Sequence, residues 1–232
     1  AISASFDKTL CLWNLSTGRS IGPSLTGHQA GVKAVKVYDN GHRAVSGSYD
    51  HTLQIWDLDT LSPLGAPLAG HEDWVCDLDV YQKEDATLCL SASSDKTFAL
   101  WDLSHKKCIG RSVHGNHSSI NTIHFLNGGE KCILATDDGI IKIWDLRQFT
   151  AAESHIIVES HSRINGLCTY GNSQCAIVSD DGIMRVFDLT TGTLLKEIDI
   201  MHGVSVVGID LSQALFDKEN TKRYLCDTGA IV

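Results

Sequence analysis

The chain has 232 residues, of which 43% are apolar and 20% are charged, a composition typical of a globular protein with a sizeable core. Its 28 acidic and 19 basic residues give a net charge of −9, and no basic run is longer than the pair Lys106–Lys107, so direct binding to nucleic acid is disfavoured. No segment reaches the roughly 18 uninterrupted apolar residues of a membrane span. The opening residues also lack the basic and apolar regions of a signal peptide, which favours a cytoplasmic or nuclear location.

Short β-strands are the predicted element along the whole chain. The alternating VKAVKV at 32–37 predicts one strand, and a polar turn at 38–42 leads into a second, RAVSGS, at 43–48. A tight turn at 49–51 leads into a third strand, TLQIWDL, at 52–58, and a short fourth strand follows before the next Gly-His pair. No segment shows a convincing helical period. The pattern therefore predicts sets of four short strands.

An internal repeat of about 43 residues organises the chain. Five segments align without a gap, and their aromatic anchors are Trp13, Trp56, Trp101, Trp144 and Phe187. An aspartate stands six positions before each anchor, at Asp7, Asp50, Asp95, Asp138 and Asp181. A small hydroxyl stands eight positions before it, at Ser5, Ser48, Ser93, Thr136 and Ser179, and a histidine precedes each complete unit, at His28, His71, His117, His161 and His202. One unit alone cannot cover both faces of its sheet, so the units must pack on one another.

These repeats resemble the WD40-repeat family, whose naming dipeptide occurs at Trp56-Asp57, Trp101-Asp102 and Trp144-Asp145. The resemblance covers essentially the whole chain and implies an all-β fold, a WD40 β-propeller with about five and a half four-stranded blades. Residues 1–232 are then one propeller segment, with units that end near residues 27, 70, 116, 160 and 202 and an incomplete last unit. Because propellers of this family most often have seven blades, we expect a fragment of a longer chain, part of a larger, seven-bladed ring.

Serine, histidine and aspartate together suggest a catalytic triad as one interpretation. An enzyme needs one such set in one cleft, whereas here the set recurs in four successive units, so we interpret it as a repeated structural network. The resemblance implies His28 with Ser48, Asp50 and Trp56; His71 with Ser93, Asp95 and Trp101; His117 with Thr136, Asp138 and Trp144; and His161 with Ser179 and Asp181. The hydroxyl ten positions before the anchor is an open alternative, present as Ser3, Ser46 and Ser91 but replaced by Leu134 and Ile177.

No metal ion or cofactor is expected. His114, His117 and His124 cluster in the sequence, but His117 already belongs to the repeat, and three converging ligands are not indicated. The pairs Asp137-Asp138 and Asp180-Asp181 lack the alternating carboxylates of a calcium loop. Phosphate-loop, dinucleotide-binding and hydrolase motifs do not occur, and we interpret the eight scattered cysteines as reduced, buried thiols.

We expect a non-catalytic scaffold for protein–protein or peptide interactions, because the resemblance implies a rigid binding platform. In WD40 propellers the face with the turn aspartates is the commonest docking surface, and the residues that we place there are Phe6, Tyr49, Glu72, Asp73, Trp74, Asp137 and Asp180. Aromatic anchors beside acidic groups indicate partners with basic segments. The alternative is that Trp74 packs between blades and that the acidic residues only solvate turns.

Arg147 supports a second hypothesis. In Ile143-Trp144-Asp145-Leu146-Arg147 it completes a W-D-x-R motif similar to that of WD40 substrate receptors of cullin-RING ubiquitin ligases. A guanidinium just past the strand has the geometry for two parallel hydrogen bonds to a ubiquitin-ligase adaptor. Less favoured is an enzyme, or a regulatory segment of a multidomain enzyme, because the SIGPSLTGH and PLGAPLAGH phrasing is similar to that of repeats appended to larger proteins.

Overall fold

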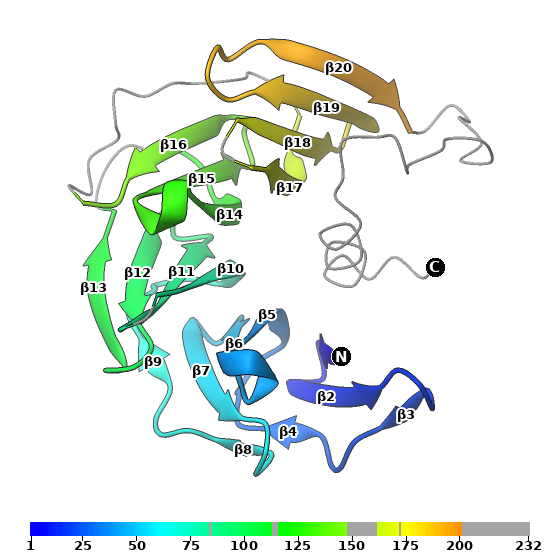
Figure 1. Ribbon diagram of the computed structural model, residues 1–232, viewed down its shortest axis with the longest axis vertical. Coiled ribbons are helices and arrows are strands. Elements are labelled where there is room, and N and C mark those ends of the chain that lie inside the picture. The colour runs from blue at the N-terminus through cyan, green and yellow to red at the C-terminus, as the bar shows by residue number, and fades with distance from the viewer. Residues whose placement is uncertain (84, 113–115, 148–161, 172, 201–232) are drawn as a thin grey trace.

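The computed structural model describes residues 1–83, 85–112, 116–147, 162–171 and 173–200, which form five antiparallel β-sheets (Figure 1). We number these sheets as blades 1 to 5 in chain order. Blade 1 contains β1 (Ile2–Ala4), β2 (Thr9–Asn14), β3 (Arg19–Ser20) and β4 (Leu25–Thr26), and blade 2 contains β5 (Val32–Tyr38), β6 (Arg43–Ser48), β7 (Thr52–Asp57), β8 (Ser62–Pro63) and β9 (Leu68–Ala69). Blade 3 contains β10 (Val75–Gln82), β11 (Thr87–Ser93), β12 (Phe98–Asp102) and β13 (Lys107–Arg111), and blade 4 contains β14 (Ile120–Leu126), β15 (Lys131–Thr136) and β16 (Ile141–Asp145). Blade 5 contains β17 (Ile164–Tyr170), β18 (Gln174–Ser179), β19 (Ile183–Asp188) and β20 (Leu194–Asp199).

The predicted all-β propeller fold is confirmed. The three strands predicted at 32–37, 43–48 and 52–58 correspond to β5, β6 and β7. The fourth strand differs from the prediction, because it is divided into β8 and β9, which both pair with β7. Between them Gly65 has φ +91°, and Pro67 has no N–H to donate to a ladder. In the described part of the chain the helical turns are η1 (Asp39–Gly41) and η2 (Asn127–Gly129), and no helix there is long and apolar enough to cross a membrane.

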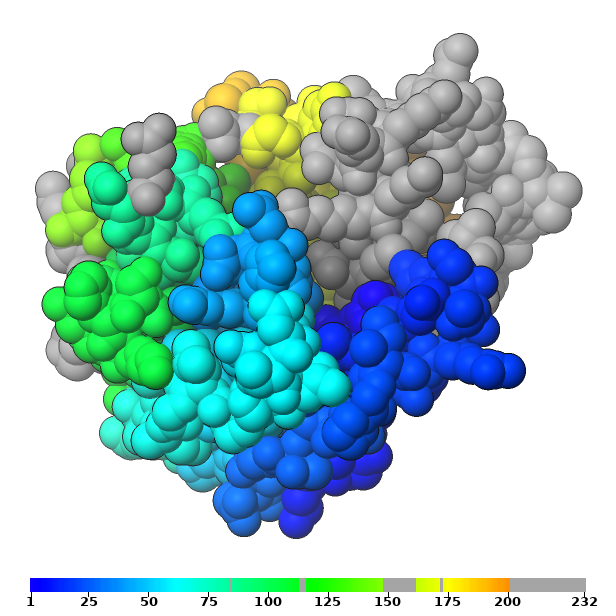
Figure 2. Space-filling model, turned by 60° about the horizontal axis from the view of Figure 1, so that its bottom comes forward, coloured from blue at the N-terminus to red at the C-terminus, as the bar shows by residue number. Residues whose placement is uncertain are grey.

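The blades follow one another around a common axis (Figure 1). In blades 2 to 5 the first strand, β5, β10, β14 or β17, is innermost, and β10 packs against β5 on one side and β14 on the other. Towards the outside, β8 of blade 2 contacts β4 of blade 1, where the cyan segment meets the blue one in Figure 2. In blades 2 to 5 the aspartate turn joins the second strand to the third, and in blade 1 the turn with Asp7 joins β1 to β2, so these turns share one end of the molecule.

The aromatic anchors of the repeat fill the spaces between successive blades. Trp56 of blade 2 packs with Leu10 and Leu25 of blade 1, and the later anchors pack on their preceding blades in the same way. The buried anchors, each at most 4% exposed, are Trp56, Trp101, Trp144 and Phe187. Trp13 of blade 1 is 37% exposed. Burying one large apolar side chain contributes about 1.5–3 kcal/mol, so the anchors hold neighbouring blades together.

Polar side chains of the inner strands also reach from one blade to the next. Asp77 and Asp79 of β10 accept hydrogen bonds from backbone N–H groups of β14 at 3.0 and 2.9 Å. His124 of β14 donates from Nε2 to a backbone carbonyl oxygen of β17 at 2.7 Å, and its Nδ1 lies 3.7 Å from Asp79. Burial opposes protonation of His124, but the contact with Asp79 outweighs burial and raises the pKa of the imidazole. Backbone groups on the inner edges of these blades are therefore bonded to side chains of the preceding blade.

Candidate functional site

The network of blade 2 starts at His28, in the loop before β5. Its Nδ1–H donates to Asp50 at 2.8 Å, and its Nε2 lies 2.7 Å from the hydroxyl of Ser46. Ser46 also accepts the indole N–H of Trp56 at 2.8 Å. The hydroxyl between histidine and tryptophan is therefore Ser46, ten positions before the anchor, and our assignment of Ser48 is wrong.

Ser48 closes the turn instead. Its hydroxyl donates to the carbonyl oxygen of Gly31 at 3.0 Å and accepts the N–H of Asp50 at 3.1 Å. Side chains two residues apart on a strand share a face, so Ser46 and Ser48 both point toward the loop that carries the histidine. Ser48 lies at the end of β6, beside the turn, and Ser46 lies deeper in the strand next to the indole of Trp56.

Blade 3 repeats this arrangement. His71 Nδ1 lies 2.9 Å from Asp95, and Nε2 lies 2.6 Å from the hydroxyl of Ser91. Ser91 accepts the indole N–H of Trp101 at 2.8 Å. Ser91 thus occupies the position that we assigned to Ser93, which was wrong for the same reason as in blade 2.

The turn aspartates of these two blades are held in the ionised form. Burial opposes ionisation of Asp95, but hydrogen bonds from His71 and Thr97 outweigh it and lower the pKa of the carboxyl group. The pKa of Asp50 is lowered in the same way, against burial, by hydrogen bonds that include one from Thr52. Each charged carboxylate therefore ties the histidine loop to the tight turn of the same blade.

Blade 4 lacks this network, and our prediction for it is wrong. His117 is exposed and, within the described residues, makes no hydrogen bond to Asp138. Thr136 donates its hydroxyl to Asp138, while the indole N–H of Trp144 is buried and has no hydrogen-bond partner among the described residues. Leu134 stands where blades 2 and 3 have the bridging serine, so the indole has no acceptor at this position.

The residue before the histidine gives a second reason why blade 4 lacks the network. A Cβ atom on Gly27 or Gly70 would lie 3.0 or 2.9 Å from the ring of the adjacent tryptophan. Blade 4 has Asn116 at this position, and its side chain prevents the same close approach of the loop to Trp144. Both polar atoms of the Asn116 side chain are buried and have no hydrogen-bond partner in the described part of the chain, so this loop is not held as its counterparts in blades 2 and 3 are.

In blade 5 a cation binds the turn aspartate. His161 lies outside the described residues. Ser179 donates to Asp181 at 2.7 Å, and Arg185 forms an ion pair with Asp181 at 2.7 Å. Arg185 lies directly across the strands from Ile177, the residue that replaces the bridging serine.

Blades 2 and 3, which have a bridging serine, differ from blades 4 and 5 by two substitutions that occur together in the sequence. Lys142 of blade 4 lies directly across from Leu134 and interacts electrostatically with Asp138. Blades 2 and 3 have the uncharged Gln54 and Ala99 at this place, two positions before the anchor. Loss of the hydroxyl thus coincides with gain of a basic residue, a signal that sequence reasoning missed because it compared positions one at a time.

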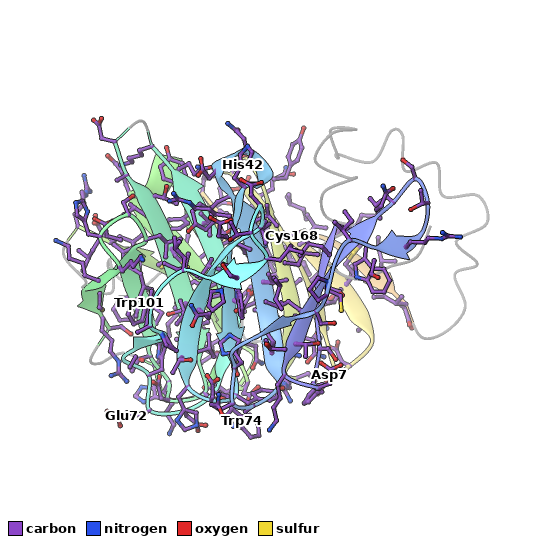
Figure 3. All side chains as sticks on the ribbon, turned by 90° about the horizontal axis from the view of Figure 1, so that it is seen from below. Asp7, His42, Glu72, Trp74, Trp101 and Cys168 are labelled. Carbon is purple, nitrogen blue, oxygen red and sulfur yellow. The ribbon has the colours of Figure 1, made fainter. Side chains whose placement is uncertain are left out.

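Phe6, Tyr49 and Trp74 form an aromatic ladder on the face that carries the turn aspartates. The ring centroids of Phe6 and Tyr49 are 5.2 Å apart, and those of Tyr49 and Trp74 are 4.5 Å apart. Phe6 is 72% exposed and Trp74 is 49% exposed. Trp74 and Glu72 lie at one end of the molecule, and His42 lies at the other (Figure 3). Trp74 therefore packs on a neighbouring blade and still presents about half of its surface.

A pocket of about 480 Å³ opens beside the ladder, and its lining includes Tyr49, Trp74, Asp73, Asp137 and Arg163. Asp137 forms an ion pair with Arg163, whose Nε lies 2.9 Å away, and accepts a hydrogen bond from Asn121 at 2.6 Å. Since Asp137 is already paired with a cation, it contributes little free negative charge to this pocket. Within the described residues Asp73 makes no ion pair.

The two other predicted acidic residues also differ from each other. Asp180 accepts a hydrogen bond from Asn165. The side chain of Glu72 is 84% exposed, and its nearest cation is Arg111 at 3.9 Å. The acidic groups that remain open to a partner are thus those beside Trp74.

Arg147 is folded back on its own chain. Its Nε and Nη2 donate to the two carboxylate oxygens of Asp145 at 3.1 and 2.6 Å. These hydrogen bonds lower the pKa of Asp145 to about 2. The forked edge of the guanidinium is therefore occupied by the aspartate of the Trp-Asp pair, at the end of β16 opposite the aspartate turn.

Metal coordination is not indicated where the side chains are described. His114 lies outside the described residues, His117 is exposed at a loop, and His124 faces β17. No group of three or more histidine, cysteine, aspartate or glutamate side chains in the described part of the chain is arranged to hold a metal ion.

Comparison with known families identifies the fold more closely. A model of the β-propeller family described as "Nucleolar protein 10-like, N-terminal domain" matches residues 2–187. The chain belongs to this family. Within the nucleolar protein 10-like propeller, the matched region begins in β1 and ends at the anchor Phe187 of β19, so it includes both kinds of blade.

Curated relatives come from other WD40-repeat proteins. Guanine nucleotide-binding protein subunit beta of Zea mays is 29% identical over 150 residues, and its counterpart in Oryza sativa subsp. japonica is 30% identical over 150 residues. Small ribosomal subunit protein RACK1 of Caenorhabditis elegans is 30% identical over 91 residues. These matches cover 63%, 63% and 36% of this chain, and 28% of each relative. The relatives support a protein-interaction scaffold, a class that is typically non-enzymatic.

Proposed function

We propose that this propeller is a non-catalytic scaffold that binds a segment of another protein on the face with the turn aspartates. The aromatic ladder of Phe6, Tyr49 and Trp74, in which Phe6 and Trp74 are exposed, is the observation that carries the proposal. Exposed tryptophan and tyrosine side chains dominate the energetics of many protein interfaces, because they bury a large area at a low cost in side-chain entropy. The ladder spans blades 1 to 3, so a bound segment would cross more than one blade.

The finer proposal is that the bound segment is basic. The faces of Tyr49 and Trp74 attract cations through their electron-rich surfaces, and Glu72 and Asp73 stand beside Trp74 without a close ion pair among the described residues. We place the basic side chains of the partner here rather than at Asp137, which already binds Arg163.

A binding experiment with the whole chain tests both statements. A fluorescein-labelled peptide of alternating arginine and glycine serves as the basic probe, with a glutamate–glycine peptide as the control ligand. We expect Trp74→Ala to weaken binding of the basic probe about tenfold or more. Leu15→Ala is the matched control, because Leu15 is 72% exposed, like Phe6, at the other end of β2. Equal binding by wild type, Trp74→Ala and Tyr49→Ala would contradict the proposal.

The ubiquitin-ligase alternative stays a prediction. An adaptor that uses Arg147 would have to displace Asp145 from both nitrogen atoms. We expect Arg147→Ala to leave co-purification with a cullin-RING adaptor unchanged; a loss of co-purification would favour the receptor function instead.

For location we propose the nucleus or the cytoplasm. The matching family is described as nucleolar protein 10-like, and one relative is named as a ribosomal subunit protein. Fluorescence microscopy of the tagged, full-length protein tests this, and a signal confined to the secretory pathway would contradict it.

A further inference from the structure

The loop at residues 70–74, which joins β9 to β10, carries Trp74 into the docking face. Two of its groups bind the same carboxylate: His71 Nδ1 lies 2.9 Å from Asp95 Oδ2, and the N–H of Glu72 donates to that oxygen at 2.9 Å. The position of Trp74 is therefore set by how firmly Asp95 holds this loop.

Arg111, the last residue of β13, adds a second attachment. Its Nη1 donates to the carbonyl oxygen of Gly70 at 2.7 Å, its Nη2 donates to Asp95 at 2.9 Å, and its Nε donates to the hydroxyl of Thr97 at 2.9 Å. The guanidinium is planar, so these three acceptors are held in a fixed mutual arrangement. One rigid group thus joins the start of the loop to the turn aspartate.

Blade 2 shows what the same loop does without this attachment. Its carbonyl at Gly27 accepts a hydrogen bond from Gln29 of its own loop at 3.1 Å, and no arginine in the described residues binds Asp50. That loop presents no aromatic residue, whereas the loop attached to Arg111 presents Trp74.

We propose that Arg111 is a positioning residue that holds the loop at 70–74 in the conformation that docks a partner. The inference rests on the proposed function, because the position of Trp74 matters only if Trp74 contacts that partner. Arg111 is not among the residues that line the pocket. It acts by ordering the loop before binding, which removes an entropic cost from the binding step.

Hydrogen exchange of the free, full chain tests the positioning without any partner. In Arg111→Ala we expect the Glu72 amide to exchange about tenfold faster, because charge-assisted hydrogen bonds at Gly70 and Asp95 are lost. Arg185→Ala is the matched control: it removes an arginine from Asp181 in blade 5 and should leave exchange at Glu72 unchanged. Unchanged exchange at Glu72 in Arg111→Ala would overturn the proposal.

Arg111→Lys keeps the test decisive if the alanine variant loosens the whole chain. A lysine retains the charge, but its single nitrogen atom cannot reproduce the planar arrangement of Nε, Nη1 and Nη2 that binds the three acceptors. In Arg111→Lys we expect the Glu72 amide to exchange faster than in wild type, while exchange rates in blade 5 stay unchanged. An equal rise of the exchange rate at Glu72 and in blade 5 would overturn the proposal.

Binding of the arginine–glycine peptide then separates position from charge. Arg111→Ala removes a cation beside Glu72, which by itself should strengthen binding of a basic peptide. Weaker binding by this variant would therefore show that the loop at 70–74 has lost its position. We expect about two- to tenfold weaker binding by Arg111→Lys, whose net charge is that of wild type. Wild-type affinity in this variant would contradict the inference. If the wild-type chain binds no peptide, the proposal of a basic partner is contradicted. The hydrogen-exchange result still tests whether Arg111 positions the loop.

Discussion

Replacing Ser46 by alanine tests the corrected network in depth. The hydroxyl accepts the indole N–H of Trp56 at 2.8 Å and lies 2.7 Å from His28 Nε2, and all three residues are at most 5% exposed. Its removal leaves two buried polar groups without a partner, each at about 1–3 kcal/mol, so we expect about 2–6 kcal/mol of lost stability. For a chain of this size that corresponds to a fall in melting temperature of about 4 °C or more.

Urea unfolding of the whole chain, followed by circular dichroism and tryptophan fluorescence, measures this loss. Ser48→Ala is the matched control, because the carbonyl oxygen of Gly31 keeps the N–H of Tyr49 as a donor when the Ser48 hydroxyl is removed. The N–H of Asp50 loses its acceptor in Ser48→Ala, so we expect a smaller loss of about 1–3 kcal/mol. A cost for Ser48→Ala equal to or above that for Ser46→Ala would refute the reasoning. Coupling between Ser46→Ala and Trp56→Phe in a double-mutant cycle gives the indole's share.

Three further predictions concern packing and pH. Gly70→Ala should cost about 1–3 kcal/mol in the same unfolding assay, because its Cβ would lie 2.9 Å from the ring of Trp101; no loss would show that the loop shifts freely. The folded pKa of Asp95 lies below the unfolded value, so its stabilisation is present above about pH 4 and is lost as the pH falls through the folded pKa. Asp95→Asn should therefore reduce the dependence of the unfolding free energy on pH at the acid end. The folded pKa of His124, which faces Asp77, Asp79 and Lys36, is raised, so its stabilisation is present below about pH 6.5 and is lost as the pH rises through the folded pKa. His124→Gln should therefore remove a decline of stability above neutral pH, and an identical profile would contradict this.

Much of the fold could be predicted from the repeat alone. Each turn aspartate stands six positions before its anchor, a histidine precedes each complete unit, and the structure places His28 beside Asp50 and His71 beside Asp95. The choice between serines eight and ten positions before the anchor could not be predicted, because both point to the same side of one strand. The distance from each serine to the indole decides it, and that distance depends on the pairing of β6 with β7.

The departures in blades 4 and 5 have a different origin. In the sequence, Asn116 and Leu134 resemble ordinary variation in the repeat. Asn116 replaces the glycine that lets the histidine loop approach the tryptophan ring, and Leu134 replaces the serine that accepts the indole N–H. Arg111 was missed because β12 and β13 pair with a shifted register, so its approach to Asp95 has no counterpart in the sequence spacing. The ion pair of Asp137 with Arg163 could not be predicted either, because it joins loops of two different blades.

The side chains that bridge the inner strands have a consequence for how partners are recognised. An open strand edge can accept a further strand from another protein through backbone hydrogen bonds alone. On the inner edges of β14 and β17, N–H and carbonyl groups already bind Asp77, Asp79 and His124 from neighbouring blades. A partner cannot extend these two sheets at their inner edges without first breaking those bonds, so backbone pairing at the inner edges of β14 and β17 is disfavoured.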